Sequence, residues 1–173
     1  MRSPKKSAVA ENWILDASPL IVLARIGHED LFFALADQVV IPRAVALEIQ
    51  AGPAEDQAQQ ALAAGRFTIV DTPPSSPEIL AWDLGNGETA VLSYALSEVG
   101  WTAILDDAAA RKCARSFSIP VRGTLAIVLL AKQRELIPSA AEVLRSLRTA
   151  GFYLDLQTIR DALLRTVGEE WLP

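Results

Sequence analysis

Short apolar runs alternate with helical patterns along this chain, and that alternation limits the fold more than any other feature of the sequence. It favours an α/β domain in which helices connect the strands of a parallel sheet. The length of 173 residues is enough for one such domain with its own buried core. The runs predict five strands, at Trp13–Leu15, Val39–Ile41, Phe67–Val70, Trp101–Leu105 and Ile119–Val121.

Prolines, glycines and capping residues predict where the helices begin and end. Ser18 as an N-cap, with Pro19 at the first helical position, opens a helix that runs through Leu23. Thr124 is expected to cap another. Further helices are predicted at Leu31–Ala36, Arg43–Gln50 and Asp56–Ala64, from Ser76 with an interruption at Gly85–Gly87 before Glu88–Val99, after Asp107 through Ser116, at Leu125–Leu136, from Ser139, and at Leu156–Val167.

Composition indicates a globular protein of one domain, with 51% hydrophobic and 21% charged residues. We expect a flexible tail over residues 1–11 and a single domain over residues 12–173, with a helical extension from about residue 138. The longest apolar run, Leu125–Ala131, is far shorter than the roughly 20 residues that cross a membrane. The lone Cys113 cannot form an internal disulfide, which fits a cytoplasmic location.

Two of the predicted strands end in aspartates: Asp16 follows the first, and Asp106 and Asp107 follow the fourth. In an open parallel sheet the ligand crevice lies beyond the carboxyl ends of the strands. A sheet with right-handed crossovers that reverses direction after its third strand makes the first and fourth strands neighbours. We therefore expect these aspartates at the same edge of the sheet.

Each acid also has a structural explanation. Asp16 could stabilise the amino end of the following helix, and Glu88 begins a helix whose dipole favours a carboxylate. Glu48 lies among apolar residues, where a carboxylate needs a partner unless it belongs to an exposed stripe. Asp106 and Asp107 repel each other, and either a bound cation or a solvated turn would relieve that repulsion.

Together the acids predict a site for Mg²⁺ or Mn²⁺, because carboxylate oxygens suit these ions. The sequence has no cluster of histidines and cysteines for zinc: His28 stands alone, and Cys113 has apolar neighbours. The net charge of −5 argues against a protein that simply coats nucleic acid, although it leaves open an enzyme that acts on one.

The motifs and their order resemble those of a PIN domain. Asp16-Ala17-Ser18 is followed by Glu48, Gly85-Asn86-Gly87-Glu88, Asp106-Asp107 with Arg111, and Gly123-Thr124. This series is similar to the bacterial PIN branch with G-x-G-E, D-D-x-x-x-R and G-T motifs, which includes VapC-type toxin ribonucleases. The resemblance runs from about Asn12 to about Gly151 and implies a three-layer α/β/α sandwich, with a parallel sheet of about five strands ordered 3-2-1-4-5.

The resemblance also implies roles for individual residues. The expected catalytic acids are Asp16, Glu48, Glu88, Asp106 and Asp107, of which all but Glu48 would bind the metal. The hydroxyl groups of Ser18 and Thr124 would support these acids, and Arg111 and Arg115 would contact the substrate phosphate. Many family members place a further acid about three residues after the fourth strand, where this chain has Ala108, Ala109 and Ala110.

The leading hypothesis is therefore a Mg²⁺- or Mn²⁺-dependent endoribonuclease, acting as the toxin of a toxin–antitoxin pair. A PIN-fold module that binds RNA or protein without cleaving is the second hypothesis, and a phosphatase-like hydrolase is the third. The expected partners are RNA and an antitoxin, without a membrane. The apolar stretch Leu125–Ala131 and the last helix also suggest a homodimer.

Overall fold

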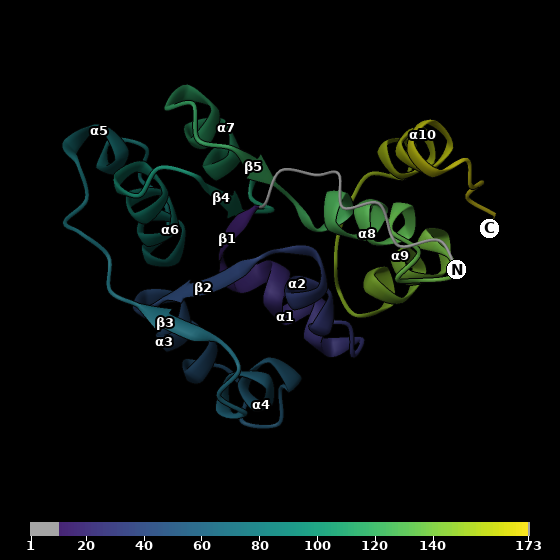
Figure 1. Ribbon diagram of the computed structural model, residues 1–173, viewed down its shortest axis with the longest axis horizontal. Helices are drawn as coiled ribbons and strands as arrows, with labels where there is room; N and C mark the ends of the chain where they lie inside the picture. Colours follow the sequence, from purple (N-terminus) through teal and green to yellow (C-terminus); the bar gives the residue numbers. More distant parts are fainter. Residues whose placement is uncertain (1–10, 173) are drawn as a thin grey trace.

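A five-stranded sheet forms the centre of the protein, and each strand pairs in parallel with its neighbour (Figure 1). The computed structural model describes residues 11–172. The strand order is β3-β2-β1-β4-β5, which confirms the expected order 3-2-1-4-5. The strands are β1 (Asn12–Leu15), β2 (Gln38–Pro42), β3 (Thr68–Val70), β4 (Trp101–Ile104) and β5 (Val121–Arg122).

The central strands are buried on both faces, as expected for a parallel sheet covered by helices. Trp13, Ile14 and Leu15 of β1 have no exposed surface. β1 and β4 pair in register over their whole length, from Asn12 opposite Trp101 to Leu15 opposite Ile104. This register brings the residues that follow both strands to the same edge.

Two predicted strands begin later than the apolar runs suggested. β3 starts at Thr68 rather than Phe67, and β5 starts at Val121 rather than Ile119. Pro120 has no N–H to donate, although its carbonyl accepts a hydrogen bond from the N–H of Ala103 at 2.8 Å. Ile119 is buried just before the strand, so its apolar character reflects core packing.

Helices flank the sheet on both faces and complete the expected α/β/α sandwich (Figure 1). α6 packs against β1, β2 and β4, whereas α2 contacts β2 and α8. The helices are α1 (Ala17–Arg25), α2 (Asp30–Leu35), α3 (Arg43–Ala51), α4 (Gln57–Ala63), α5 (Pro77–Leu80), α6 (Asn86–Ser97), α7 (Ala108–Ser116), α8 (Thr124–Gln133), α9 (Ala140–Thr149) and α10 (Leu156–Val167).

Several helix starts differ from the expected ones, including those of α1, α6 and α8. The N-cap of α1 is Asp16 rather than Ser18, so Pro19 lies inside the first turn, where a missing N–H leaves no helical bond unmade. The N-cap of α8 is Gly123 rather than Thr124, and Gly85 caps α6, which already begins at Asn86. In each case the helix takes in residues that the sequence pattern left outside it.

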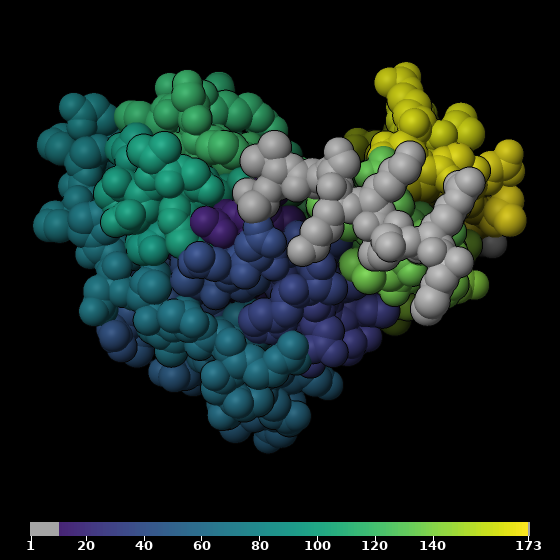
Figure 2. Space-filling model, viewed as in Figure 1, coloured from purple at the N-terminus to yellow at the C-terminus, as the bar shows by residue number. Residues whose placement is uncertain are grey.

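The last three helices form a group of their own, on the side away from α5 and α6 (Figures 1 and 2). α8 packs against α2, α9 and α10, and most of the apolar stretch Leu125–Ala131 is buried in these contacts. That stretch suggested a homodimer, but the chain covers most of it with its own helices. Among the described residues no helix is long and apolar enough to span a membrane.

The end of the described chain is bound to this group through Glu169. Its carboxylate accepts hydrogen bonds from the N–H groups of Ala140 and Ala141 and from the hydroxyl of Ser139, at 2.8–3.1 Å. A carboxylate at a helix amino end satisfies N–H groups that have no partner within the helix. Glu169 therefore fixes the segment after α10 against the start of α9.

The expected N-terminal tail is described only at its last residue, Glu11, which accepts hydrogen bonds from Arg122 at 2.7 and 2.9 Å. Residues 1–10 of that tail lie outside the described residues.

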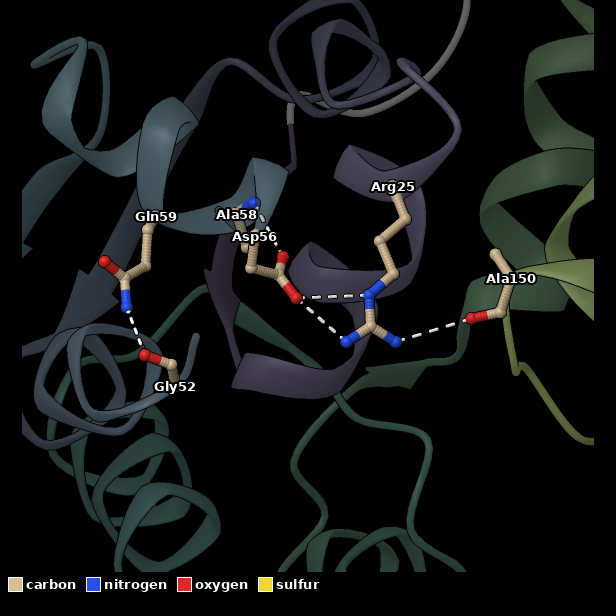
Figure 3. Close-up of polar contacts among 6 residues, drawn as sticks. All are labelled: Arg25, Gly52, Asp56, Ala58, Gln59 and Ala150. Carbon is tan, nitrogen blue, oxygen red and sulfur yellow. Dashed lines mark hydrogen bonds and ion pairs between the residues drawn. The ribbon is translucent and has the colours of Figure 1, made fainter. Parts of the chain in front are cut away.

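Arg25 connects three elements that are distant in the sequence (Figure 3). Its guanidinium donates to Asp56 Oδ2 at 2.8 and 3.2 Å and to the carbonyl of Ala150 at 3.4 Å. Asp56 is also the N-cap of α4, because its Oδ1 accepts the N–H of Ala58 at 3.0 Å. One carboxylate thus caps a helix and holds α1 against α4.

We expect the cap to contribute more to stability than the ion pair, because the Arg25 side chain is 40% exposed. Asp56→Asn retains a capping acceptor and should lower the free energy of unfolding by less than about 1 kcal/mol. Asp56→Ala removes both interactions and should cost about 1 kcal/mol more. Urea unfolding of the two variants measures the difference, and equal losses would show that the ion pair dominates.

Candidate active site

The carboxyl edge of the sheet gathers the acids that the sequence singled out, beginning with Asp16. This residue directly follows β1, and its side chain is only 5% exposed. Although Asp16 is the N-cap of α1, its carboxylate makes no capping hydrogen bond. Helix capping therefore does not explain why a charged side chain is buried at this position.

Glu48 reaches the same edge from α3, where it lies on the exposed side of the helix. Its Oε1 accepts a hydrogen bond from the N–H of Gly87 at 3.0 Å. A Cβ atom at position 87 would lie 2.9 Å from both carboxylate oxygens of Glu48, closer than side chains tolerate. Gly87 therefore admits this carboxylate because it has no side chain.

Glu88 is half-buried in the first turn of α6, next to Gly87. Its Oε2 accepts the N–H of Gly85 at 2.9 Å, as the acid of a capping box does. The structural explanation for Glu88 is thus correct, because this side chain stabilises the start of the helix. The remaining oxygen, Oε1, forms no hydrogen bond with a described residue.

Asp106 and Asp107 follow β4 and have different partners. Asp106 accepts the N–H of Thr124 at 2.7 Å and its hydroxyl at 2.6 Å, so both carboxylate oxygens are oriented by one residue. Thr124 is fully buried. Asp107 is exposed and caps α7 by accepting the N–H of Ala110 at 2.8 Å. The adjacent aspartates therefore have different structural roles. Asp107 caps a helix with one oxygen, whereas both oxygens of Asp106 are held by Thr124.

The other predicted residues lie nearby with different orientations. Ser18 is exposed, and its hydroxyl donates to no described residue. Arg111 is half-buried and donates from Nη1 to the carbonyl of Leu105 at 3.1 Å, so its guanidinium is held by the protein itself. Arg115, one turn further along α7, is exposed. No role was predicted for Gly87 and Gly123. The side chain of Glu48 lies close to Gly87, and those of Arg111 and Asp106 lie close to Gly123.

The sequence of residues 12–169 matches the PIN-domain family DUF3368. The chain belongs to the PIN-domain family. Among curated proteins, none matches this PIN domain. Among solved structures it is similar to the crystal structure of PAE2754 from Pyrobaculum aerophilum, with 17% identity and a TM-score of 0.49, over 75% of this chain and 99% of that chain.

Burial and electrostatic repulsion raise the pKa values of two acids at this edge, Asp16 and Glu88. Burial, together with the negative charges of Glu88, Glu48 and Asp106, raises the pKa of Asp16 to about 7, although a hydrogen bond from the Ala17 backbone opposes the rise. Burial likewise raises the pKa of Glu88, with added repulsion from Asp107 and Glu48. Asp16 and Glu88 therefore lie close enough to the other acids for those negative charges to raise both pKa values.

Asp106 is a partial exception to this repulsion. Burial raises its pKa, but the hydrogen bonds from Thr124 and the positive charge of Arg111 oppose that rise. For Arg111, burial and the nearby charge of Arg115 lower the pKa, whereas Asp106 raises it. Perturbed carboxylates that gather at a strand edge are typical of functional sites, although structural networks also produce them.

The donor atoms at this edge fit a hard divalent cation, because they are carboxylate oxygens without histidine or cysteine. Within the described residues, no three acidic, histidine or cysteine side chains surround a common point as they lie. Glu48 and Glu88 are instead bound to backbone N–H groups. The chemistry of the donor set fits Mg²⁺ or Mn²⁺, and an ion would have to draw these side chains together.

A surface cavity of about 500 Å³ lies elsewhere, at the far end of α1 from Asp16. It is lined mainly by α1 and α4, including Arg25 and Gln57. It contains none of the five acids.

Asp16 should make the stability of the protein depend on pH. Its pKa is about 7 in the folded protein against an ordinary 3.8, so the unfolded chain releases this proton first as the pH rises. Stability should therefore fall between about pH 4 and about pH 7, by up to about 4 kcal/mol. Asp16→Asn removes this loss, and urea unfolding with a chelator should find the variant more stable than wild type at about pH 8.

Asp161→Asn, an exposed acid on α10, is the matched control and should keep the wild-type pH dependence. Equal unfolding free energies for wild type and Asp16→Asn at about pH 8 would contradict the prediction.

Proposed function

We propose that this PIN domain is a divalent-metal-dependent endoribonuclease that hydrolyses RNA phosphodiester bonds. PIN domains are generally nucleases, so membership of the family supports hydrolysis of nucleic acid. The observation that carries the proposal is Asp16, a buried acid without a capping bond that is repelled by Glu48, Glu88 and Asp106. An arrangement that destabilises the protein in this way is expected where function requires it.

Asp16, Glu88, Asp106 and Asp107 would hold Mg²⁺ or Mn²⁺, with Glu48 beside them. When bound, the ion would polarise the scissile phosphodiester and lower the pKa of the attacking water. The protein's own contribution is to orient the acids. Thr124 holds both oxygens of Asp106, and the N–H of Gly87 holds Glu48. These bonds give the carboxylates of Asp106 and Glu48 defined orientations at the edge of the sheet.

The two arginines of α7, Arg111 and Arg115, differ in how free their guanidinium groups are. The Nη1 of Arg111 is bound to the Leu105 carbonyl, whereas Arg115 is exposed one turn later on the same helix. Arg115 is therefore the one free to meet a substrate phosphate through its planar guanidinium. An antitoxin partner, the toxin role, the homodimer and the cytoplasmic location remain predictions from the sequence.

Purified protein should cleave a labelled single-stranded RNA when Mn²⁺ is present and leave it intact with a chelator. Asp16→Asn should reduce the rate by at least about 100-fold, because it removes a charge that the reaction requires. Asp161→Asn should retain the wild-type rate. Single-turnover assays with RNA and DNA of the same sequence measure both the loss and the preference for RNA.

The same Asp16→Asn protein should be folded and, at neutral pH without metal, more stable than wild type, so the lost activity could not be due to unfolding. Equal cleavage by wild type and Asp16→Asn would overturn the nuclease proposal. RNA binding without cleavage would support a non-catalytic PIN module instead.

Gly87→Ala should reduce cleavage while leaving the fold intact. The new methyl group would displace the Glu48 carboxylate, which lies 2.9 Å from its position. Because alanine favours a helix over glycine, stability should remain within about 1 kcal/mol of wild type. A double-mutant cycle identifies the route: Gly87→Ala should cause little further loss in a Glu48→Ala background. Additive losses would show that Gly87 acts independently of Glu48.

A further inference from the structure

The carboxyl edge carries a positive charge of its own, supplied by Arg111 from the second turn of α7. The guanidinium donates from Nη1 to the Leu105 carbonyl at 3.1 Å. This carbonyl directly precedes Asp106, so Arg111 is fixed to the strand end that bears the paired aspartates.

Gly123 shows how closely the guanidinium and the Asp106 carboxylate approach each other. A Cβ atom at Gly123 would lie 2.6 Å from Nη1 of Arg111 and 3.1 Å from Oδ1 of Asp106. The guanidinium of Arg111 and the carboxylate of Asp106 therefore both lie close to the α-carbon of Gly123. They form no direct ion pair among the described residues, so the positive charge acts on Asp106 across a short gap.

The start of α7 offers one carboxylate beside this charge, that of Asp107, which the proposed first ion already uses. Ala108, Ala109 and Ala110 make up its first turn, and Asp107 is committed to capping the helix through Oδ2. On this side of the edge, Arg111 is the first long side chain after the aspartates. A second divalent ion here would meet few free ligands and a fixed positive charge.

We propose that Arg111 occupies the place of a second cation and limits the carboxylate edge to one divalent ion. This inference rests on the proposed function, because it assumes that the acids bind a metal. Arg111 is then a residue that sets the metal stoichiometry, and it offsets part of the repulsion between Asp106 and the other acids. Its charge, rather than the shape of its guanidinium, is what matters for this role.

Titration of the full-length protein with Mn²⁺, by calorimetry and by electron paramagnetic resonance of the free ion, tests this directly. Wild type should bind one ion. Arg111→Met keeps the aliphatic stem but removes the charge, so it should bind the first ion about five- to tenfold more tightly and admit a second. Arg111→Lys keeps the charge and should still bind one ion. Arg115→Met, on the exposed turn, should match wild type.

Each outcome has a distinct meaning. Two ions in the wild type, or one ion with unchanged affinity in a folded Arg111→Met, would overturn the inference while leaving the proposed metal site intact. No Mn²⁺ binding by the wild type would overturn the proposed function itself. If Arg111→Met does not fold, as judged by circular dichroism, the comparison of Arg111→Lys with wild type still decides: a second ion in Arg111→Lys would show that the guanidinium contacts, not the charge, exclude it.

Discussion

The parallel pairing of β1 with β4 is the constraint on which the rest of the site depends. The two strands run in register to their last residues, and the N–H of Asp16 donates to the carbonyl of Ile104 at 3.1 Å, which extends the ladder one residue beyond β1. Asp16 and Asp106 consequently follow neighbouring strands at one edge. The direction in which successive strands are added to the sheet reverses at this pair, since β2 and β3 lie on one side of β1 and β4 and β5 on the other. Such a reversal is where open parallel sheets form their crevices.

Burial at this edge explains why the acids affect one another so strongly. A carboxylate that is taken out of water loses solvation whatever its neighbours are, and other negative charges then add to that loss. Asp16 experiences both effects, whereas Asp106 has hydrogen bonds from Thr124 and a nearby arginine to oppose them. The edge therefore combines one acid whose burial is made worse by neighbouring negative charges with one whose burial is partly offset by hydrogen bonds and a positive charge. This contrast, more than the number of acids, distinguishes the arrangement from an ordinary acidic surface.

Much of the fold could be predicted from the sequence, because apolar runs of strand length report burial directly. The strand-end positions of Asp16 and Asp106 followed from the same runs and a rule about crossovers. Glu48 and Glu88 could be assigned only through the resemblance, because each has a local environment that a structural role explains equally well. Their partners are backbone N–H groups, and the bond from Gly87 to Glu48 spans 39 residues, which no local pattern reveals.

Helix starts were the least predictable part, and α8 shows one physical cause. Hydroxyl residues such as Thr124 are strong capping candidates in isolation, and no local pattern indicates that a strand-end acid accepts a hydrogen bond from the same hydroxyl. Asp106 accepts hydrogen bonds from both the N–H and the hydroxyl of Thr124, and the N-cap of α8 is Gly123 instead. Tertiary hydrogen bonds thus moved the boundary by one residue.

Gly87 lies in helix α6 with an ordinary backbone conformation, so flexibility is not the reason for a glycine there. What the position supplies is an empty volume of one methyl group, filled from outside by the carboxylate of another helix. The Glu48 carboxylate of α3 can thereby reach the backbone N–H of Gly87 in α6, so one hydrogen bond between the two helices depends on a missing atom. Grafting either helix alone onto a different scaffold would carry over the charges and lose the fit.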